Sequence, residues 1–331
     1  MTDPVPSPFS AFLPAGLPRQ AGERLAVPAL PGCGTAGLLA TLRDRARGFT
    51  LVLVPSVAVA EALEAELRYF AGNAGRLAVL PDPEVLPYDA FSPHQDLISR
   101  RLTVLRDVAA GRINTLVVAA STLLPRLPPR RYLGAYSVTL TRGERLTPEQ
   151  LRLSLDTAGY QRVTQVIEHG DYAVRGSLVD FFPMGSESPV RIDFLDDEIE
   201  SIRRFDPDTQ LSGEQLASLE TLPAREIPTD AEAVRLFRSA YRRRFEGNPA
   251  RSIVYREVSE GRIPGGVENY LPLFFESTAL LWDYLPAPRL TVAWGEPEDL
   301  LAAPWQQIAD RHADAGDDSE RPALRPEELN G

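Results

Sequence analysis

A glycine-rich segment at residues 32–39, Gly-Cys-Gly-Thr-Ala-Gly-Leu-Leu, is the strongest candidate for catalytic chemistry in this chain. Gly32 and Gly37 have the G-x-x-x-x-G spacing of a phosphate-binding loop. The segment follows a short apolar stretch at residues 25–27 and precedes a predicted helix, which is the context that such a loop requires. The candidate chemistry is therefore the binding and transfer of a nucleotide phosphate.

The two residues that follow this glycine pair are of the wrong type for that chemistry. A working loop continues with a lysine that reaches the β- and γ-phosphates and a serine or threonine that holds magnesium. Leucines occupy both positions, and the chain contains no lysine at all. We therefore expect no catalytic residue here, with weak residual anion binding as the open alternative. The inactive loop consists of Gly32, Gly34, Gly37, Leu38 and Leu39.

The remaining ionisable residues do not predict a second reactive centre. His94, His169 and His312 are too dispersed to indicate a zinc site, and the single cysteine, Cys33, adds little. The acidic residues between positions 193 and 200 lack the spacing of a calcium loop. We interpret them as a hairpin turn with a solvated edge, and we expect no metal site.

Residues 168–204 predict short β-strands joined by tight turns. The alternation at residues 190–195 places three apolar side chains on one face of a strand and leaves a second face of mixed character. That second face carries Arg191, Asp193 and Leu195. An arginine beside an exposed leucine suits a docking surface better than a solvated face. The alternative is that Arg191, and likewise Arg175 on a neighbouring strand, only pair with nearby acids such as Asp193 or Glu187.

Several motifs resemble the N-terminal region of bacterial transcription-repair coupling factor (Mfd). They are Glu-His-Gly at 168–170, Val-Arg-Gly at 174–176, Phe-Pro-Met-Gly at 182–185, Asp-Phe-Leu-Asp-Asp-Glu-Ile at 193–199, Pro-Tyr-Asp-Ala-Phe-Ser-Pro-His at 87–94 and Tyr-Leu-Pro-Leu-Phe-Phe at 270–275. The resemblance runs from about Pro31 to Leu285, with the motifs in the family's order. It implies a similarity to the first domains of the excision-repair protein UvrB, including an inserted domain that binds UvrA.

By this resemblance, UvrA binding falls on Arg175, Arg191 and Leu195. The family has an aromatic residue where this chain has Leu195, so the anchor departs from the pattern but stays apolar. The neighbouring Phe194 points into the core by the alternation argument. The residue types fit the role, because guanidinium groups bind carboxylates through two parallel hydrogen bonds and a central apolar anchor is common in binding hot spots.

The fold class that the resemblance implies is α/β. It is a degenerate helicase-like (P-loop NTPase-like) parallel-sheet domain, split in sequence, with an inserted β-rich α+β domain. Alternating strand and helix patterns over residues 24–129 independently predict right-handed crossovers and a largely parallel sheet. The expected order is a flexible arm at 1–22, the first half of the α/β domain (1A) at 23–136, the inserted UvrA-binding domain (2) at 137–222, the second α/β part (1B) at 223–300, and an acidic proline-rich linker at 301–331.

Composition limits the environment and the partners. The hydrophobic fraction of 44% favours packed domains, and no apolar run approaches the roughly 18 residues that a membrane span needs. With no signal peptide and one cysteine, we expect a cytoplasmic protein without a membrane partner. The net charge of -11 argues against broad binding of phosphate backbones. A local exception is the basic run Arg242, Arg243 and Arg244, which we interpret as a solvated helix face, with a nucleic-acid or partner contact left open.

We expect a non-catalytic adaptor that recruits UvrA to an RNA polymerase stalled at a lesion, and no cofactor in this chain. By resemblance, ATP, Mg²⁺, duplex DNA and RNA polymerase engage other, C-terminal domains of the family, and contacts with those domains mask the UvrA-binding surface. Two alternatives remain. An ATP-dependent DNA-repair helicase domain is opposed by Leu38 and Leu39. A DNA-binding module using the arginine-rich helix at 235–244 predicts steeply salt-dependent affinity for duplex DNA.

Overall fold

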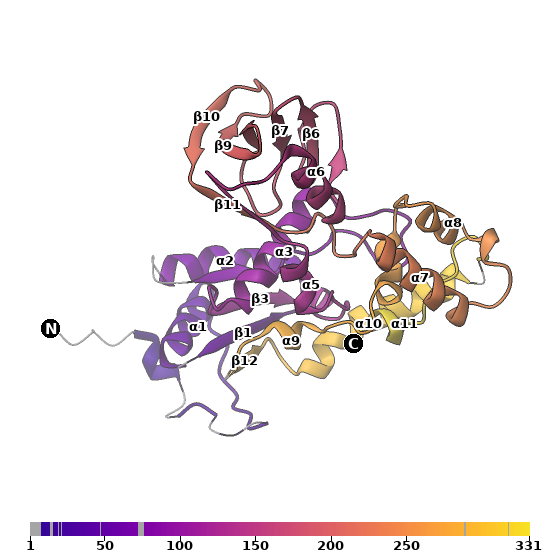
Figure 1. The fold of residues 1–331 in the computed structure, drawn as a ribbon. Coiled ribbons are helices and arrows are strands. Elements are labelled where there is room, and N and C mark those ends of the chain that lie inside the picture. The colour runs from indigo at the N-terminus through magenta and orange to yellow at the C-terminus, as the bar shows by residue number, and fades with distance from the viewer. Residues whose placement is uncertain are drawn as a thin grey trace. The chain divides into compact units, whose positions relative to one another are not determined.

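The chain divides into two compact units in the computed structural model, which describes residues 8–13, 16–18, 20, 22–46, 48–71, 76–287, 289–316 and 318–331 (Figure 1). Unit 1 comprises Met1–Leu80, Asp107–Leu123 and Leu285–Pro304, and unit 2 comprises Pro81–Arg106, Leu124–Tyr284 and Trp305–Gly331. No helix within the described ranges combines the length and the apolar character that crossing a bilayer requires.

Unit 1 is built on a parallel sheet of four strands in the order β12-β1-β3-β2. Its strands are β1 (Phe49–Val54), β2 (Leu77–Val79), β3 (Thr115–Ala119) and β12 (Arg289–Ala293). The described helices are η1 (Pro8–Phe12), α1 (Gly34–Arg45), α2 (Val57–Ala71), α4 (Ala120–Leu123) and the start of α10 (Pro297–Ala315). The central strands β1 and β3 are buried along their whole length, as expected for the interior of a parallel sheet covered by helices.

The split of the α/β sheet is completed by β12, which follows the inserted segment in sequence. It pairs in parallel with β1, with Phe49 opposite Arg289 and Leu53 opposite Ala293 (Figure 1). The sequence predicted a parallel sheet, and this is confirmed. It did not show how the two flanks of the inserted domain rejoin. Of the residues predicted as the second α/β part, β12 pairs with β1 in unit 1, whereas residues 223–284 belong to unit 2.

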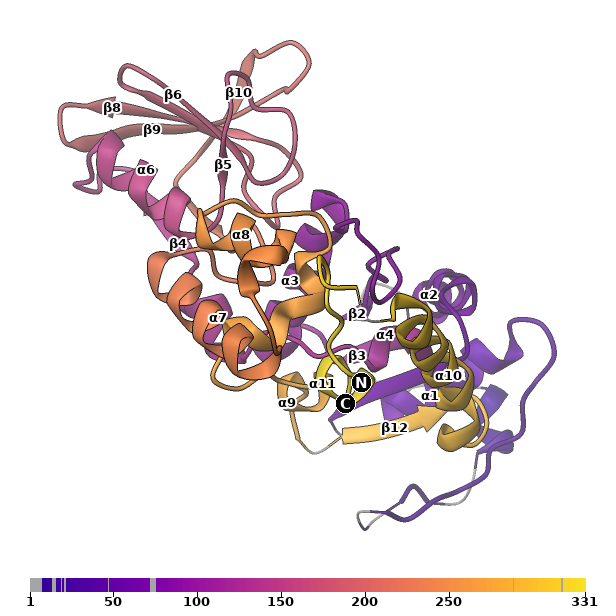
Figure 2. The ribbon, with the colours of Figure 1, turned by 90° about the vertical axis from the view of Figure 1, so that its right-hand side faces the viewer.

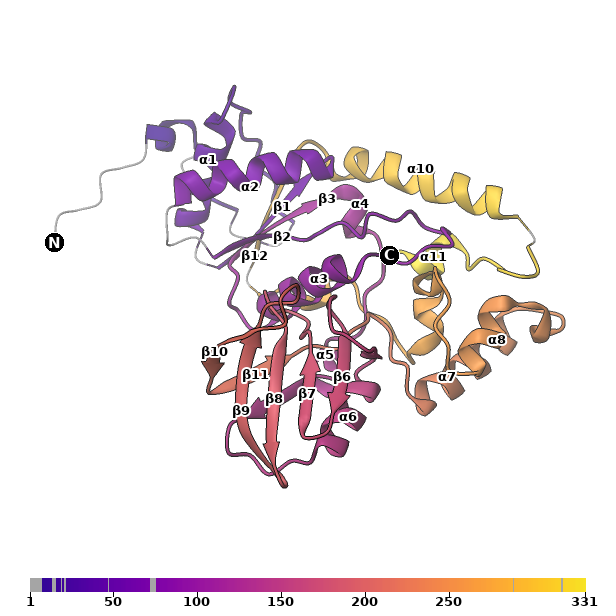
Figure 3. The same ribbon diagram turned by 90° about the horizontal axis from the view of Figure 1, so that it is seen from above.

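Unit 2 contains a six-stranded sheet in the order β10-β9-β8-β7-β6-β5, with β6 to β9 lying side by side in Figure 3. The strands are β5 (Gln161–Arg162), β6 (Asp171–Arg175), β7 (Leu178–Phe181), β8 (Val190–Leu195), β9 (Glu198–Phe205) and β10 (Ser212–Leu216). A second ribbon pairs β4 (Val138–Thr141) with β11 (Ser218–Thr221).

One face of the six-stranded sheet packs against helix α6 (Pro148–Thr157), as Figure 2 shows. Thr147 and Gln150 form a capping box at its start. Leu151 and Leu155 are fully buried against the sheet. The opposite face of the sheet is therefore the one available to a partner.

A helical part of unit 2 surrounds an aromatic core. Its elements are α3 (Gln95–Ala109), shared with unit 1, α5 (Arg130–Ala135), α7 (Ala231–Arg244), η3 (Pro249–Arg251), α8 (Ile253–Ser259), η4 (Val267–Phe274), α9 (Leu281–Tyr284), the end of α10, and α11 (Pro326–Leu329). Phe237 of α7 stacks on Phe274 of η4 with ring centroids 4.7 Å apart. Tyr241, Tyr255 and Tyr270 complete the buried cluster.

Two terminal predictions differ from the structure. Residues 301–331, expected as a linker, contribute most of α10 and all of α11, and both Leu324 and Leu329 are buried in the aromatic core. The linker was predicted from the acidic, proline-rich composition of the segment, which gives no weight to two single apolar residues. At the other end, the arm predicted at 1–22 falls partly outside the described residues, and within it Pro8–Phe12 forms a 3-10 helix that packs beside α1.

Candidate functional site

The face of the six-stranded sheet opposite α6 brings together residues from three strands. Strand pairing places Asp180 of β7 opposite Arg191 of β8, Leu178 opposite Asp193, and Arg175 of β6 opposite Leu178. Because paired residues point to the same side of a sheet, these residues share one surface with Leu195. We call this surface the docking face; it consists of Arg175, Leu178, Asp180, Arg191, Asp193 and Leu195.

The alternation predicted along β8 is confirmed. Val190, Ile192 and Phe194 are buried, whereas Leu195 is 63% exposed. Phe194 therefore points into the core as predicted. Leu195 pairs with Glu198 across the turn at Asp196, which adopts a left-handed conformation with φ of 54°. The tight turn holds the leucine side chain at the end of a rigid strand, where it remains open to solvent.

Arg191 is held by a buried carboxylate rather than left free. Its Nε and Nη2 atoms donate to the two carboxylate oxygens of Asp180 at 2.7 and 2.9 Å, and the Asp180 side chain is only 3% exposed. The hydrogen bond to Asp180 raises the pKa of Arg191 above its usual range despite partial burial. The third donor group, Nη1, lies 3.3 Å from Ser212 Oγ, and the guanidinium carbon lies 5.0 Å from the centre of the Phe205 ring.

The acid that pairs with Arg191 was not among those suggested by the sequence. Neither Asp193 nor Glu187 is the partner, because Asp180 lies directly opposite on the neighbouring strand. A periodic pattern shows which face a residue occupies but not the register between strands. The alternating sequence of β7 could have placed Asp180 on one of two faces, and only the pairing decides which.

Arg175 is less constrained than Arg191. Its Nη2 donates to the Thr164 carbonyl oxygen at 2.7 Å, and its Nη1 lies 4.0 Å from an oxygen of Asp180. Its side chain is 49% exposed, compared with 20% for Arg191. The three predicted binding residues thus lie on one face, with Arg191 fixed, Arg175 partly tethered and Leu195 free.

One end of the docking face is covered by the chain itself. Val163 and Val166, in the segment that follows β5, pack on Ala173, Phe182 and Phe205 to form a small apolar cluster. This cover limits the accessible area to the end of the sheet that carries Arg175 and Leu195. A partner therefore meets a short surface that carries Leu195, Arg175 and the partly exposed Asp193 rather than the whole sheet.

The glycine-rich segment of unit 1 forms a turn at residues 31–33 and the first residues of α1, which begins at Gly34. The residues that precede it, 23–30, do not form a strand, and a Cβ atom on Gly37 would overlap the Phe9 ring of η1. Thr35 is also engaged, since its hydroxyl donates to the Leu30 carbonyl oxygen at 2.8 Å and accepts from the Leu30 amide at 3.0 Å. Phe9 thus closes the helix at Gly37, whereas Gly32 and Cys33 just before α1 remain exposed.

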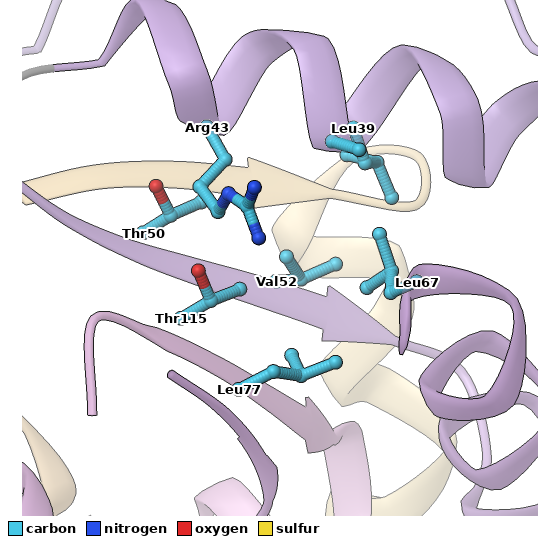
Figure 4. Close-up of a pocket in the computed structure, with 8 residues that line it drawn as sticks. Leu39, Arg43, Thr50, Val52, Leu67, Leu77 and Thr115 are labelled. Carbon is cyan, nitrogen blue, oxygen red and sulfur yellow. The ribbon is translucent and has the colours of Figure 1, made fainter. Parts of the chain in front are cut away.

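The two leucines that replace the catalytic positions of a phosphate-binding loop are buried core residues. Leu39 points toward Val52, Leu67 and Leu77 and lines, with them, a cavity of about 10 Å³ (Figure 4). Such a volume admits about one water molecule. A lysine or a magnesium-binding hydroxyl at these positions would have to enter an apolar core.

The basic run of α7 separates into residues with different surroundings. Arg244 forms two hydrogen bonds with Glu328 at 2.5 and 2.6 Å, so its charge is balanced within unit 2. Arg242 and Arg243 remain exposed. Sequence reasoning did not distinguish the three arginines, because the partner of Arg244, Glu328, lies 84 positions away in the chain.

Comparison with known proteins identifies the family. A family model described as the UvrB interaction domain matches residues 138–227, the part that contains the docking face. The transcription-repair-coupling factor of Escherichia coli is 41% identical over 314 residues, which cover 95% of this chain. This chain belongs to the transcription-repair coupling factor family. The resemblance in the sequence motifs is thereby confirmed.

Other members of the transcription-repair coupling factor family are also similar over most of this chain. The protein of Haemophilus influenzae is 37% identical over 97% of this chain, and that of Myxococcus xanthus is 33% identical over 80%. The chain spans 27% of the length of the Escherichia coli protein and 28% of that of the Haemophilus protein. The chain therefore corresponds to about a quarter of the length of these two proteins.

Proposed function

We propose that this chain is a non-catalytic adaptor that binds UvrA through the docking face and thereby recruits nucleotide-excision repair to a stalled RNA polymerase. The observation that supports it is that the exposed Leu195 and the half-exposed Arg175 lie on one face of the sheet, on which the third predicted residue, Arg191, is held by Asp180. The match of this region to the UvrB interaction domain model supports the proposal.

Each residue of the docking face has a distinct role in this proposal. Leu195 is the apolar anchor, and its burial in a partner contributes about 1.5–3 kcal/mol. Arg175 binds a carboxylate of UvrA with the donors that it does not use internally. Arg191 maintains the shape and the positive potential of the surface, because its own donors are already committed to Asp180 and Ser212.

The adaptor acts without a nucleotide of its own. Leu38 and Leu39 lie in the core of unit 1, and Phe9 covers Gly37. In this proposal ATP, Mg²⁺, duplex DNA and RNA polymerase are handled by other parts of family members. Those parts also mask the docking face until they engage a stalled polymerase, and the protein works in the cytoplasm.

The test is calorimetric titration of UvrA into the chain and into two leucine variants. Leu195→Ser removes the anchor, whereas Leu153→Ser is a matched control on α6, on the other side of the sheet, with 61% exposure against 63% for Leu195. We expect Leu195→Ser to weaken binding about tenfold or more, because 1.4 kcal/mol corresponds to a factor of ten. The control should leave the affinity unchanged. Equal affinities for all three proteins would move the binding site elsewhere.

A further inference from the structure

Helix α7 carries a row of arginines beside its buried stripe. Arg235, Arg238 and Arg242 are spaced i, i+3 and i+7, so they lie along one side of the helix. At 1.5 Å per residue the row is about 10 Å long. It flanks Phe237 and Tyr241, which are buried in the aromatic core, and this packing fixes the rotation of the helix. The arginine row is therefore held at a defined place on unit 2.

Two of the row's guanidinium groups meet at one tyrosine on the neighbouring helix α8, which lies beside α7 in Figure 2. Arg238 Nε lies 3.5 Å from Tyr255 Oη, and the guanidinium carbon of Arg242 lies 5.5 Å from the centre of the Tyr255 ring. Burial opposes ionisation of Tyr255, but its hydrogen bonds and charge interactions with Arg238 and Arg242 outweigh burial and hold its pKa below the usual range. The two guanidinium groups thus give this phenol an electropositive surrounding.

The charge balance of Arg238 and Arg242 differs from that of Arg235 and Arg244 on the same helix. Arg244 is paired with Glu328, and Arg235 lies 3.9 Å from Glu232. Among the ion pairs found in the described ranges, none includes Arg238 or Arg242. Both retain guanidinium donors for an anion from outside.

The surrounding surface favours a phosphate backbone over a protein partner. The large exposed hydrophobic residues of the described chain all lie outside α7 and α8. Protein interfaces are organised around a buried apolar centre, and the docking face has one in Leu195. Phosphate contacts instead rely on arginine and on hydroxyl donors such as tyrosine, without an apolar anchor.

We propose that Arg238, Arg242 and the Tyr255 hydroxyl bind phosphate groups of a nucleic-acid duplex. The two guanidinium groups supply paired donors to phosphate oxygens, and the phenol supplies a third. The contact is independent of UvrA binding, because it involves different elements of unit 2. It gives an acidic chain a local point of attachment to a duplex, without base recognition.

The test measures fluorescence anisotropy of a labelled DNA duplex of about 20 base pairs titrated with the chain. Two phosphate contacts predict a slope of about -2 for log affinity against log salt, so affinity should fall roughly tenfold between about 50 and 200 mM salt. Arg238→Ala combined with Arg242→Ala should weaken binding at least tenfold at the lower salt and remove most of this slope. Tyr255→Phe, which keeps the ring in the core, should weaken binding several-fold.

A matched control removes the same charge elsewhere. Arg68→Ala combined with Arg131→Ala deletes two exposed arginines from α2 and α5, and should leave duplex binding unchanged. Three results would overturn the proposal. They are no duplex binding at about 50 mM salt, equal weakening by both double variants, and tighter binding of a glutamate-rich peptide than of the duplex at the same arginines.

Discussion

Because Arg191 is paired with the buried Asp180, we expect its replacement to have a different effect from the replacement of Arg175. Replacing Arg191 by alanine removes the partner of a carboxylate that is 3% exposed, whereas replacing Arg175 leaves that carboxylate paired. We therefore expect Arg191→Ala to act mainly on stability and Arg175→Ala mainly on UvrA affinity.

The expected loss of stability follows from how deeply each arginine and Asp180 are buried. Breaking a buried ion pair costs about 3–5 kcal/mol, because the remaining charge stays buried without compensation. Arg191 is 20% exposed, so water partly compensates, and we expect a loss of about 2–4 kcal/mol. Arg175 is half-exposed and lies 4.0 Å from Asp180, a geometry worth less than about 1 kcal/mol.

The assay must report on the β-rich domain itself. The three tryptophans, Trp282, Trp294 and Trp305, lie outside residues 138–227, so their fluorescence is a poor probe of this domain. Hydrogen exchange measured by mass spectrometry on peptides from β7 and β8 reports local opening directly. A loss of about 3 kcal/mol should accelerate exchange roughly a hundredfold in Arg191→Ala, and hardly at all in Arg175→Ala.

A compensating variant separates the lost ion pair from lost packing. Combining Arg191→Met with Asp180→Leu removes both charges, and such replacements are often neutral or stabilising. We expect this double variant to recover most of the protection lost in Arg191→Ala. The reasoning would be refuted if Arg191→Ala and Arg175→Ala exchanged equally fast, or if the double variant were less protected than Arg191→Ala.

Three further predictions concern other parts of the chain. Leu38→Lys combined with Leu39→Thr should not create nucleotide binding, tested with a fluorescent ATP analogue, and should lower the melting temperature by placing polar groups in the core of unit 1. Burial raises the pKa of Glu268 above its unfolded value of about 4.5, so its contribution to stability is complete below that pH and is lost as pH rises through the folded value. Glu268→Gln should therefore raise the urea midpoint at pH 7, with a gain that shrinks toward pH 4; a gain that persists at pH 4 would contradict this. Thr147→Ala should cost about 1 kcal/mol by removing the capping box of α6, and unchanged hydrogen exchange in α6 would argue against it.

Local patterns in the sequence were enough to predict several elements of the fold. The alternation of strands and helices predicted over residues 24–129 is present as β1, α2, β2, α3 and β3. The alternation along β8 gave the correct buried face. These features depend on periodicity and capping, which neighbouring residues encode.

The sequence also located the candidate site, since Arg175, Arg191 and Leu195 do share one face. The motifs around them indicated the family, and the comparisons confirmed it. Whether these residues bind UvrA stays a prediction. The inference that a lysine-free loop lacks catalytic power also came from residue types alone.

Tertiary structure decided the features that depend on residues far apart in sequence. It paired Arg191 with Asp180, joined β12 to β1, placed Phe9 over Gly37, and packed the tail that carries Glu328 against Arg244. Periodicity states which side of an element is buried, but register and long-range pairing depend on how separate elements meet. For this reason the sequence by itself determined the elements and the candidate residues, whereas only the folded chain decided which of those residues remain free to bind.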